Sequence, residues 1–309
     1  MSSTLDRMSQ DLKLDKEYIQ KILKSSDFYY KSYTIPKAAG GTRLISQPSP
    51  ELKTFQYWAV YNVLARLPAS VGAFAYKKGD CIKKHAECHA DAGFVFHTDI
   101  KNFFPSIHSE MLMKLITEIR PELEADGLWF DDLCENISKI CFRKNSLCIG
   151  AVSSPKISNA VLFSFDEKML EYCKKKKLRY SRYADDIYIS SPSYIEAQLE
   201  KDVSAALCDC GFEMNKRKTW FSSKKHRRRI TGLIITTDGK VSIGTEMRNK
   251  IKKMVYERIR HGSGDPEVLL GYLSFLRNIE PKAYNRLIVK YSGYCDGDVI
   301  EAIKNGVHE

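Results

Sequence analysis

The chain has 309 residues, of which 43% are hydrophobic and 28% are charged, and its formal net charge is +11. This composition is typical of a globular protein that is long enough to bury a sizeable core. No apolar run approaches the ~20 residues of a membrane span, and the N-terminus has no secretory pattern, so we expect no membrane association. The nine cysteines are odd in number and form no Cys-x-x-Cys pair, which favours reduced thiols in a cytoplasm over a disulfide framework.

The positive charge is concentrated in three clusters. Four consecutive lysines occupy 174–177, and denser clusters of lysine and arginine follow within 216–229 and 248–260. These side chains bind nucleic acid by releasing the counterions that condense on phosphates. The two later clusters therefore predict a nucleic-acid-binding surface, whereas the run at 174–177 fits a solvated surface equally well.

Helices and one hairpin are predicted in the first part of the chain. Apolar side chains at helical spacing predict an N-terminal helical extension over 1–35. Within 34–46, β-prone residues flank Gly40-Gly41, which predicts a hairpin. Residues 51–67 then predict a further helix.

Strands and helices alternate through the rest of the chain. In order, we predict a strand at 94–100, helices within 107–145, one long helix over 155–177, a hairpin at 178–191, a helix at 197–211 and a short hairpin at 230–243. The remaining C-terminal residues predict helices, interrupted at the segment 262–266, which contains glycine and proline.

Two adjacent carboxylates, Asp185 and Asp186, occupy the predicted turn between two β-prone segments. Like charges side by side are unfavourable without a cation, so the pair indicates a metal, although an isolated pair would fit an ordinary polar turn. A third carboxylate, Asp99, ends an apolar, β-prone segment that breaks at Pro105. Carboxylates that converge from different strands can hold two Mg²⁺ ions roughly 3.5–4 Å apart for phosphoryl transfer.

These strings resemble the motifs of reverse transcriptases, and within that family those of retron enzymes. Tyr183-Ala-Asp-Asp186 resembles the catalytic string of the family, and 99–106 resembles the first palm motif. Four further segments resemble family motifs: 43–58 the start of the retron fingers, 150–159 the Ser-Pro motif, 211–219 the lysine-bearing motif and 230–233 the Val-Thr-Gly triplet. Six motifs in family order, over roughly 40–280, make the resemblance specific.

The resemblance implies an RNA-directed DNA polymerase with an α+β fold and right-hand architecture. Residues 1–93 would form the N-terminal helical extension and fingers. Residues 94–229 would form the palm, an antiparallel sheet backed by helices, together with some fingers segments. Residues 230–309 would form a helical thumb.

The resemblance also assigns roles to individual residues. Two Mg²⁺ ions would be held by Asp99, Asp185 and Asp186 with the backbone carbonyl of Ile100. The other implied roles are triphosphate binding by Arg43, rejection of the 2′-hydroxyl by Phe104, nucleotide contacts by Gly150, Ser154 and Asn159, protonation of the leaving pyrophosphate by Lys218, and nucleic-acid contacts by Thr231, Gly232, Arg227, Arg228 and Arg229. From the residues alone, a surface arginine at 43, a core phenylalanine at 104 and a phosphate-binding or exposed lysine at 218 stay open.

Retron membership further implies the partners. These are a cognate structured noncoding RNA that serves as template and primer, its DNA product, deoxynucleoside triphosphates and an accessory effector protein in antiphage defence. Priming from an RNA 2′-hydroxyl would give a branched RNA–DNA product. Three alternatives stay open: a group II intron type of reverse transcriptase, a non-catalytic RNA-binding scaffold, and a basic structural or toxin-binding module with an accidental Asp-Asp turn.

Two positions depart from the family pattern. Ile149 stands where the family usually has glutamine, so a polar contact to the nucleotide is lost or supplied elsewhere. His85 stands at the first position of the retron Asn-Ala-x-x-His segment, while Ala86 and His89 match. The nearby Cys81 and the histidines resemble zinc ligands, but no second ligand pair follows, so we expect no zinc site.

Overall fold

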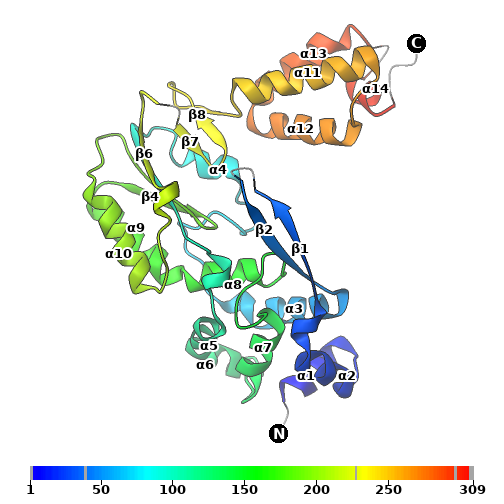
Figure 1. Ribbon diagram of the computed structural model, residues 1–309, viewed down its shortest axis with the longest axis vertical. Coiled ribbons are helices and arrows are strands. Elements are labelled where there is room, and N and C mark those ends of the chain that lie inside the picture. The colour runs from blue at the N-terminus through cyan, green and yellow to red at the C-terminus, as the bar shows by residue number, and fades with distance from the viewer. Residues whose placement is uncertain (1–2, 38–39, 227, 296–297, 306–309) are drawn as a thin grey trace. The chain divides into compact units, whose positions relative to one another are not determined.

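The computed structural model describes residues 3–37, 40–226, 228–295 and 298–305 (Figure 1). The chain forms two compact units. The first unit comprises Met1–Gly79, His97–Ile189 and Glu196–Trp220, and the second comprises Asp80–Phe96, Ser190–Ile195 and Phe221–Glu309. In the described ranges no helix has both the length and the apolar character needed to cross a membrane. In the part of the chain that the structure describes, no cysteine forms a disulfide.

The N-terminal part of the first unit contains helices and one antiparallel hairpin. Its elements are α1 (Thr4–Leu12), α2 (Lys16–Lys24), the 3-10 helix η1 (Ser26–Tyr29), β1 (Tyr30–Pro36), β2 (Thr42–Pro48), α3 (Pro50–Asn62) and the 3-10 helix η2 (Leu64–Arg66). Ser3 and Asp6 form a capping box that starts α1. Met8 on α1 and Ile19 and Ile22 on α2 are fully buried, so both helices pack an apolar face into the core. The helical extension predicted over 1–35 is confirmed only as far as Tyr29, because β1 begins at Tyr30. The antiparallel pairing predicted within 34–46 is confirmed and extends to Tyr30 and Pro48.

The middle of the chain contains a four-stranded sheet with the strand order β4-β5-β3-β6. The elements of this region are β3 (Phe94–Asp99), η3 (Phe104–Ser106), α5 (Ser109–Glu118), α6 (Arg120–Ala125), α7 (Leu133–Cys141), α8 (Ser154–Val161), α9 (Phe163–Lys175), β4 (Arg179–Tyr183), β5 (Asp186–Ser191), α10 (Gln198–Asp209), η4 (Lys216–Lys218) and β6 (Trp220–Ser223). Helix α9 packs on β4, and α10 packs on α9 (Figure 1). Strands backed by helices in this way give the α+β fold that the motifs predict.

The long helix predicted over 155–177 is wrong in one respect, because the structure divides it into α8 and α9. Leu162 separates them with a non-helical backbone (φ −88°, ψ 3°), and its side chain is fully buried. No glycine or proline marks this break, so local sequence rules could not locate it.

The second unit combines a small sheet with a helical group. Its elements are α4 (Ile82–Glu87), β7 (Arg228–Ile230), β8 (Leu233–Ile235), β9 (Val241–Ser242), α11 (Thr245–His261), α12 (Pro266–Ile279), α13 (Pro281–Ser292) and α14 (Val299–Asn305). Helices α11 to α14 pack together, as Figure 1 shows. The hairpin predicted at 230–243 is incomplete, because β7 adds a third strand antiparallel to β8. The sequence did not predict this strand, because the basic residues of β7 indicated a charged surface cluster.

Candidate active site

The structure brings the three predicted carboxylates together at one end of the sheet. Asp99 is the last residue of β3, and Asp185 and Asp186 lie in and just after the tight turn between β4 and β5. Ala184 enters that turn with a left-handed backbone, φ 57°. The amide of Ile100 donates to the carbonyl oxygen of Asp185 at 3.0 Å, which ties the end of β3 to the turn.

The three acidic groups affect one another strongly. Burial raises the pKa of Asp185 from its usual 3.8 to about 7, with further contributions from the charges of Asp186 and Asp99. A pKa this high means that the surroundings do not neutralise the charge of the ionised form. A divalent cation would supply the missing neutralisation, and the all-oxygen donor set is the one that Mg²⁺ prefers.

Asp99 is already bonded through both carboxylate oxygens. Asn215 Nδ2 donates to Oδ1 at 2.9 Å, and Lys218 Nζ donates to Oδ2 at 2.6 Å. Burial lowers the pKa of Lys218, but the hydrogen bond and charge of Asp99 outweigh burial, so the pKa is raised overall. The lysine predicted to act as an acid is therefore protonated and adjacent to the carboxylates.

His97 is a site residue that we did not predict. Its Nε2 lies 2.9 Å from Asp186 Oδ1, and its Nδ1 lies 3.0 Å from the carbonyl oxygen of Lys218. A carbonyl oxygen only accepts, so Nδ1–H donates to it, and Nε2 faces the carboxylate of Asp186. The ring also stacks on Trp220 at a centroid distance of 5.0 Å. The position two residues before Asp99 was a usable signal, because alternate residues of a strand face the same side.

A metal would have to rearrange these contacts. Within the described part of the chain, no three His, Cys, Asp or Glu side chains are gathered as a ready ligand set. Asn215 and Lys218 hydrogen-bond the two oxygens of Asp99, and His97 lies against one oxygen of Asp186. The donor types fit Mg²⁺, and movement of the Lys218 amine would free Asp99 Oδ2.

The residues predicted to contact the nucleotide divide into exposed and internal positions. Arg43 is exposed on β2, and Phe104 is half-buried in η3. Burial raises the pKa of Tyr76, as do the charges of Asp185 and Tyr183, whereas Arg43 lowers it. Tyr76 therefore lies within electrostatic reach of both the carboxylate turn and Arg43.

Gly150, Ser154 and Asn159 are constrained by the chain itself. Gly150 has φ 112°, and an added Cβ would lie 3.2 Å from the carbonyl oxygen of Ser46. Ser154 Oγ donates to the carbonyl oxygen of Cys148 at 2.8 Å, and Asn159 Nδ2 donates to that of Ala75 at 2.9 Å. Both polar side chains are buried, so they shape the site from within.

The predicted nucleic-acid contacts lie in the second unit, except that Arg227 falls outside the described residues. Arg228 is buried and donates to the carbonyl oxygens of Ala92, Ile235 and Thr236, the last at 2.6 Å. This internal placement differs from the expected surface contact, because all of these bonds hold the backbone of the unit together. Arg229 is exposed and lines a cavity of about 300 Å³.

Two segments that resemble retron-specific motifs meet in the second unit. His85 Nδ1 and Thr231 Oγ1 share a hydrogen bond, and His89 Nδ1 lies 2.7 Å from Ser190 Oγ. Burial lowers the pKa of His85 to about 3, so this ring is neutral. Thr231 has φ 46° and precedes Gly232 at φ 83° in the turn between β7 and β8. The histidine at position 85 therefore bonds the Thr-Gly turn.

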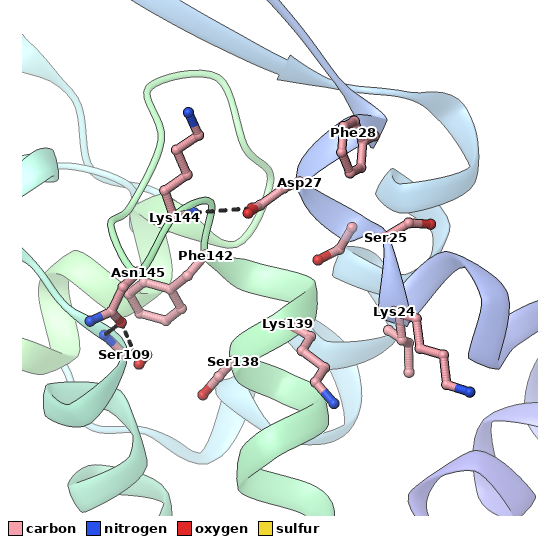
Figure 2. Close-up of a pocket in the computed structure, with 12 residues that line it drawn as sticks. Lys24, Ser25, Asp27, Phe28, Ser109, Ser138, Lys139, Phe142, Lys144 and Asn145 are labelled. Carbon is pink, nitrogen blue, oxygen red and sulfur yellow. Dashed lines mark hydrogen bonds between the residues drawn. The ribbon is translucent and has the colours of Figure 1, made fainter.

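A separate hollow of about 360 Å³ lies in the first unit, and none of the predicted site residues lines it. Figure 2 shows the amine of Lys144 directed away from the amines of Lys24 and Lys139. The amide of Lys144 donates to Asp27 Oδ1 at 3.0 Å, and Phe28 stands exposed beside them. Charged groups that do not converge give no basis for a ligand site here.

Comparisons with known proteins agree with the site. A family model described as Reverse transcriptase (RNA-dependent DNA polymerase) matches residues 35–235. Retron Ec86 reverse transcriptase of Escherichia coli is 30% identical over 294 residues, which cover 94% of this chain and 89% of that protein. Retron Ec83 reverse transcriptase, from the same organism, is 33% identical over 279 residues, which cover 85% of this chain and 87% of the relative.

Among solved structures, a telomerase from Candida Tropicalis in complex with a fragment of telomeric RNA aligns with a TM-score of 0.53. It is 12% identical and covers 91% of this chain and 58% of that one, so the likeness concerns the fold alone. The fold and the matched family model together define an RNA-directed DNA polymerase. The chain belongs to the reverse transcriptase family, and within it to the retron reverse transcriptases.

Proposed function

We propose that this enzyme extends DNA by two-metal nucleotidyl transfer at Asp99, Asp185 and Asp186, with the Ile100 carbonyl as a further ligand. Two bound Mg²⁺ ions would activate the attacking hydroxyl and stabilise the leaving oxygen of the deoxynucleoside triphosphate. The observation that carries the proposal is the raised pKa of Asp185, caused by burial and by Asp186 and Asp99. An acidic group with a raised pKa beside two further carboxylates favours a cation over a purely structural role.

Lys218 would act as the acid that protonates the leaving pyrophosphate. Its raised pKa keeps the amine charged, and its side chain is 55% exposed, so it can move away from Asp99. A positioned general acid typically contributes about 10²–10⁴-fold to the rate of a reaction.

The nucleotide would bind between exposed and internal residues of the first unit. Arg43 would hold the triphosphate through its planar guanidinium, and Phe104 would reject a 2′-hydroxyl. Gly150 would give the nucleotide close access to the backbone, whereas Ser154 and Asn159 would act by supporting the surrounding loops.

We assign 1–93 to the extension and fingers, 94–229 to the palm with some fingers segments, and 230–309 to the thumb. Within the thumb, a groove of about 450 Å³ between α11 and α13 is lined by four cationic side chains, Arg248, Lys252, Arg286 and Lys290. Such a groove suits the phosphate backbone of RNA. Arg229, Thr231 and Gly232 would extend this surface, and Arg228 would support it from inside.

The physiological substrate would be a cognate structured noncoding RNA that serves as template and primer. Priming from an RNA 2′-hydroxyl would yield a branched RNA–DNA product in the cytoplasm, and an accessory effector would link synthesis to antiphage defence. The support is membership of the retron reverse transcriptases.

The test is to express the gene with its flanking DNA and to recover nucleic acid from the purified protein. A branched molecule, in which DNA is joined to RNA and released by debranching, is the expected product. Asp186→Asn should abolish DNA synthesis by the purified enzyme while RNA binding changes less than about twofold, because affinity comes from lysine and arginine. Only linear products would favour the group II intron type, and no synthesis by the unmodified enzyme would favour the non-catalytic scaffold.

A further inference from the structure

Arg182 is a fully buried arginine two residues before the turn that carries the catalytic carboxylates. It is among the largest side chains that are wholly inside the protein. Its backbone is fixed on both sides, because its amide donates to the carbonyl oxygen of Gly72 and its carbonyl accepts from the amide of Phe74, each at 2.8 Å. A buried charge is unfavourable unless it is paired, so its partners show what this side chain does.

The charge of Arg182 is neutralised by Asp166 of α9, which is also fully buried. Arg182 Nε and Nη2 donate to the two carboxylate oxygens at 2.7 and 2.6 Å, and Tyr180 donates to the same carboxylate at 2.6 Å. Burial lowers the pKa of Arg182, but Asp166 outweighs burial and the pKa is raised overall. The guanidinium therefore keeps its charge, and its contact with Asp166 is bidentate.

The remaining arm of the guanidinium reaches the catalytic turn. Arg182 Nη1 donates to the carbonyl oxygen of Ala184 at 2.8 Å and to Asn159 Oδ1 at 3.3 Å. Ala184 has φ 57°, an unfavourable backbone conformation for a residue with a side chain, and it directly precedes Asp185. A conformation of this kind persists only when its surroundings hold it.

We propose that Arg182 is a positioning residue for DNA synthesis: anchored by Asp166, it holds the Ala184 carbonyl and so fixes the direction of Asp185 and Asp186. This inference rests on the proposed role of those carboxylates as metal ligands. Buried ion pairs can often be replaced by apolar residues of similar volume without loss of stability. The stability of the fold therefore does not explain why an ion pair, and not an apolar pair, occupies this place. An apolar side chain could not donate the hydrogen bond to the Ala184 carbonyl oxygen.

The experiment replaces the whole network by apolar side chains in the full-length enzyme, as Arg182→Met/Asp166→Leu/Tyr180→Phe. We expect a cooperative unfolding transition close to that of the unmodified protein and unchanged affinity for a template–primer. The single-turnover extension rate should fall at least tenfold. Manganese binding to the enzyme alone, followed by the EPR signal of free Mn²⁺, should weaken at least threefold.

Tyr180→Phe alone is the matched control, because it removes one bond to Asp166 and leaves the bond from Arg182 to Ala184 in place. It should keep the extension rate and Mn²⁺ affinity of the unmodified enzyme. Arg182→Lys provides the second measurement if the triple variant does not fold. Its single ammonium can pair with Asp166 but cannot also span to the Ala184 carbonyl with the same geometry, so the rate should again fall at least tenfold.

A folded triple variant with unmodified extension rate and Mn²⁺ affinity would overturn the proposal. If the triple variant fails to fold, an unmodified rate in Arg182→Lys would do the same. Failure of the unmodified enzyme to extend any primer would instead contradict the proposed function, so the two ideas fail separately.

Discussion

Lys218 Nζ donates a hydrogen bond of 2.6 Å to Asp99 Oδ2 and thereby occupies an oxygen that a metal ion would use. The side chain of Asp99 is only 4% exposed, whereas that of Lys218 is 55% exposed. The lysine is therefore the mobile partner, and the carboxylate is fixed. A protonated amine and a divalent cation must compete for the same carboxylate, since both neutralise its charge.

The first prediction follows from this competition. Lys218→Met should tighten Mn²⁺ binding to the protein severalfold, because the competing amine is gone, and should lower the maximal extension rate about 10- to 100-fold, because the general acid is lost. EPR titration and single-turnover primer extension measure the two effects. Lys101→Met is the matched control, since Lys101 pairs with the exposed Glu213. Unaltered metal affinity and rate in Lys218→Met would remove Lys218 from the mechanism.

The second prediction concerns stability and pH in the metal-free enzyme. Between its usual pKa of 3.8 and its folded value of about 7, Asp185 holds a proton in the folded protein that the unfolded chain has released. Its contribution to stability is therefore greatest at low pH and declines as pH rises towards 7. Asp185→Asn removes this decline. The free energy of unfolding of the variant should therefore rise relative to that of the unmodified protein by about 1–3 kcal/mol from pH 5 to pH 8. Urea unfolding in EDTA is the measurement, and a constant difference would contradict the assigned origin of the shift.

Local patterns predicted that the three carboxylates form a site, because each lies where a strand ends or turns. Asp99 follows an apolar run, and Asp185-Asp186 lies between two β-prone segments. The partners of these groups could not be predicted in the same way. Asp166 meets Arg182 across 16 residues of sequence, and Lys218 meets Asp99 across 119, so only the tertiary fold pairs them. The sequence predicted Arg228 to be an exposed cation for a similar reason. Its partners are backbone carbonyl groups, which leave no signal in the sequence.

The third prediction concerns sugar selection. Phe104 is half-buried in η3 and follows Asp99 by five residues. Phe104→Ala should raise the ratio of ribonucleotide to deoxyribonucleotide incorporation, because the bulk that excludes a 2′-hydroxyl is lost. Competition assays with both nucleotides measure this ratio. Phe103→Leu is the control, since Phe103 is buried in the core and should affect stability alone. An unchanged ratio in Phe104→Ala would assign that ring to the core as well.

The fourth prediction separates two adjacent arginines that the sequence alone does not distinguish. Arg229 is exposed, so Arg229→Ala should weaken RNA binding and flatten the slope of log affinity against log salt by roughly 0.7–0.9 for one lost phosphate contact. Arg228 is buried and holds backbone carbonyl groups, so Arg228→Met should lower the melting temperature and leave that slope unchanged. Filter binding at several salt concentrations, with thermal unfolding of both variants, distinguishes the two roles. A flatter slope in Arg228→Met, together with an unchanged slope in Arg229→Ala, would contradict the assignment of the RNA contact to Arg229.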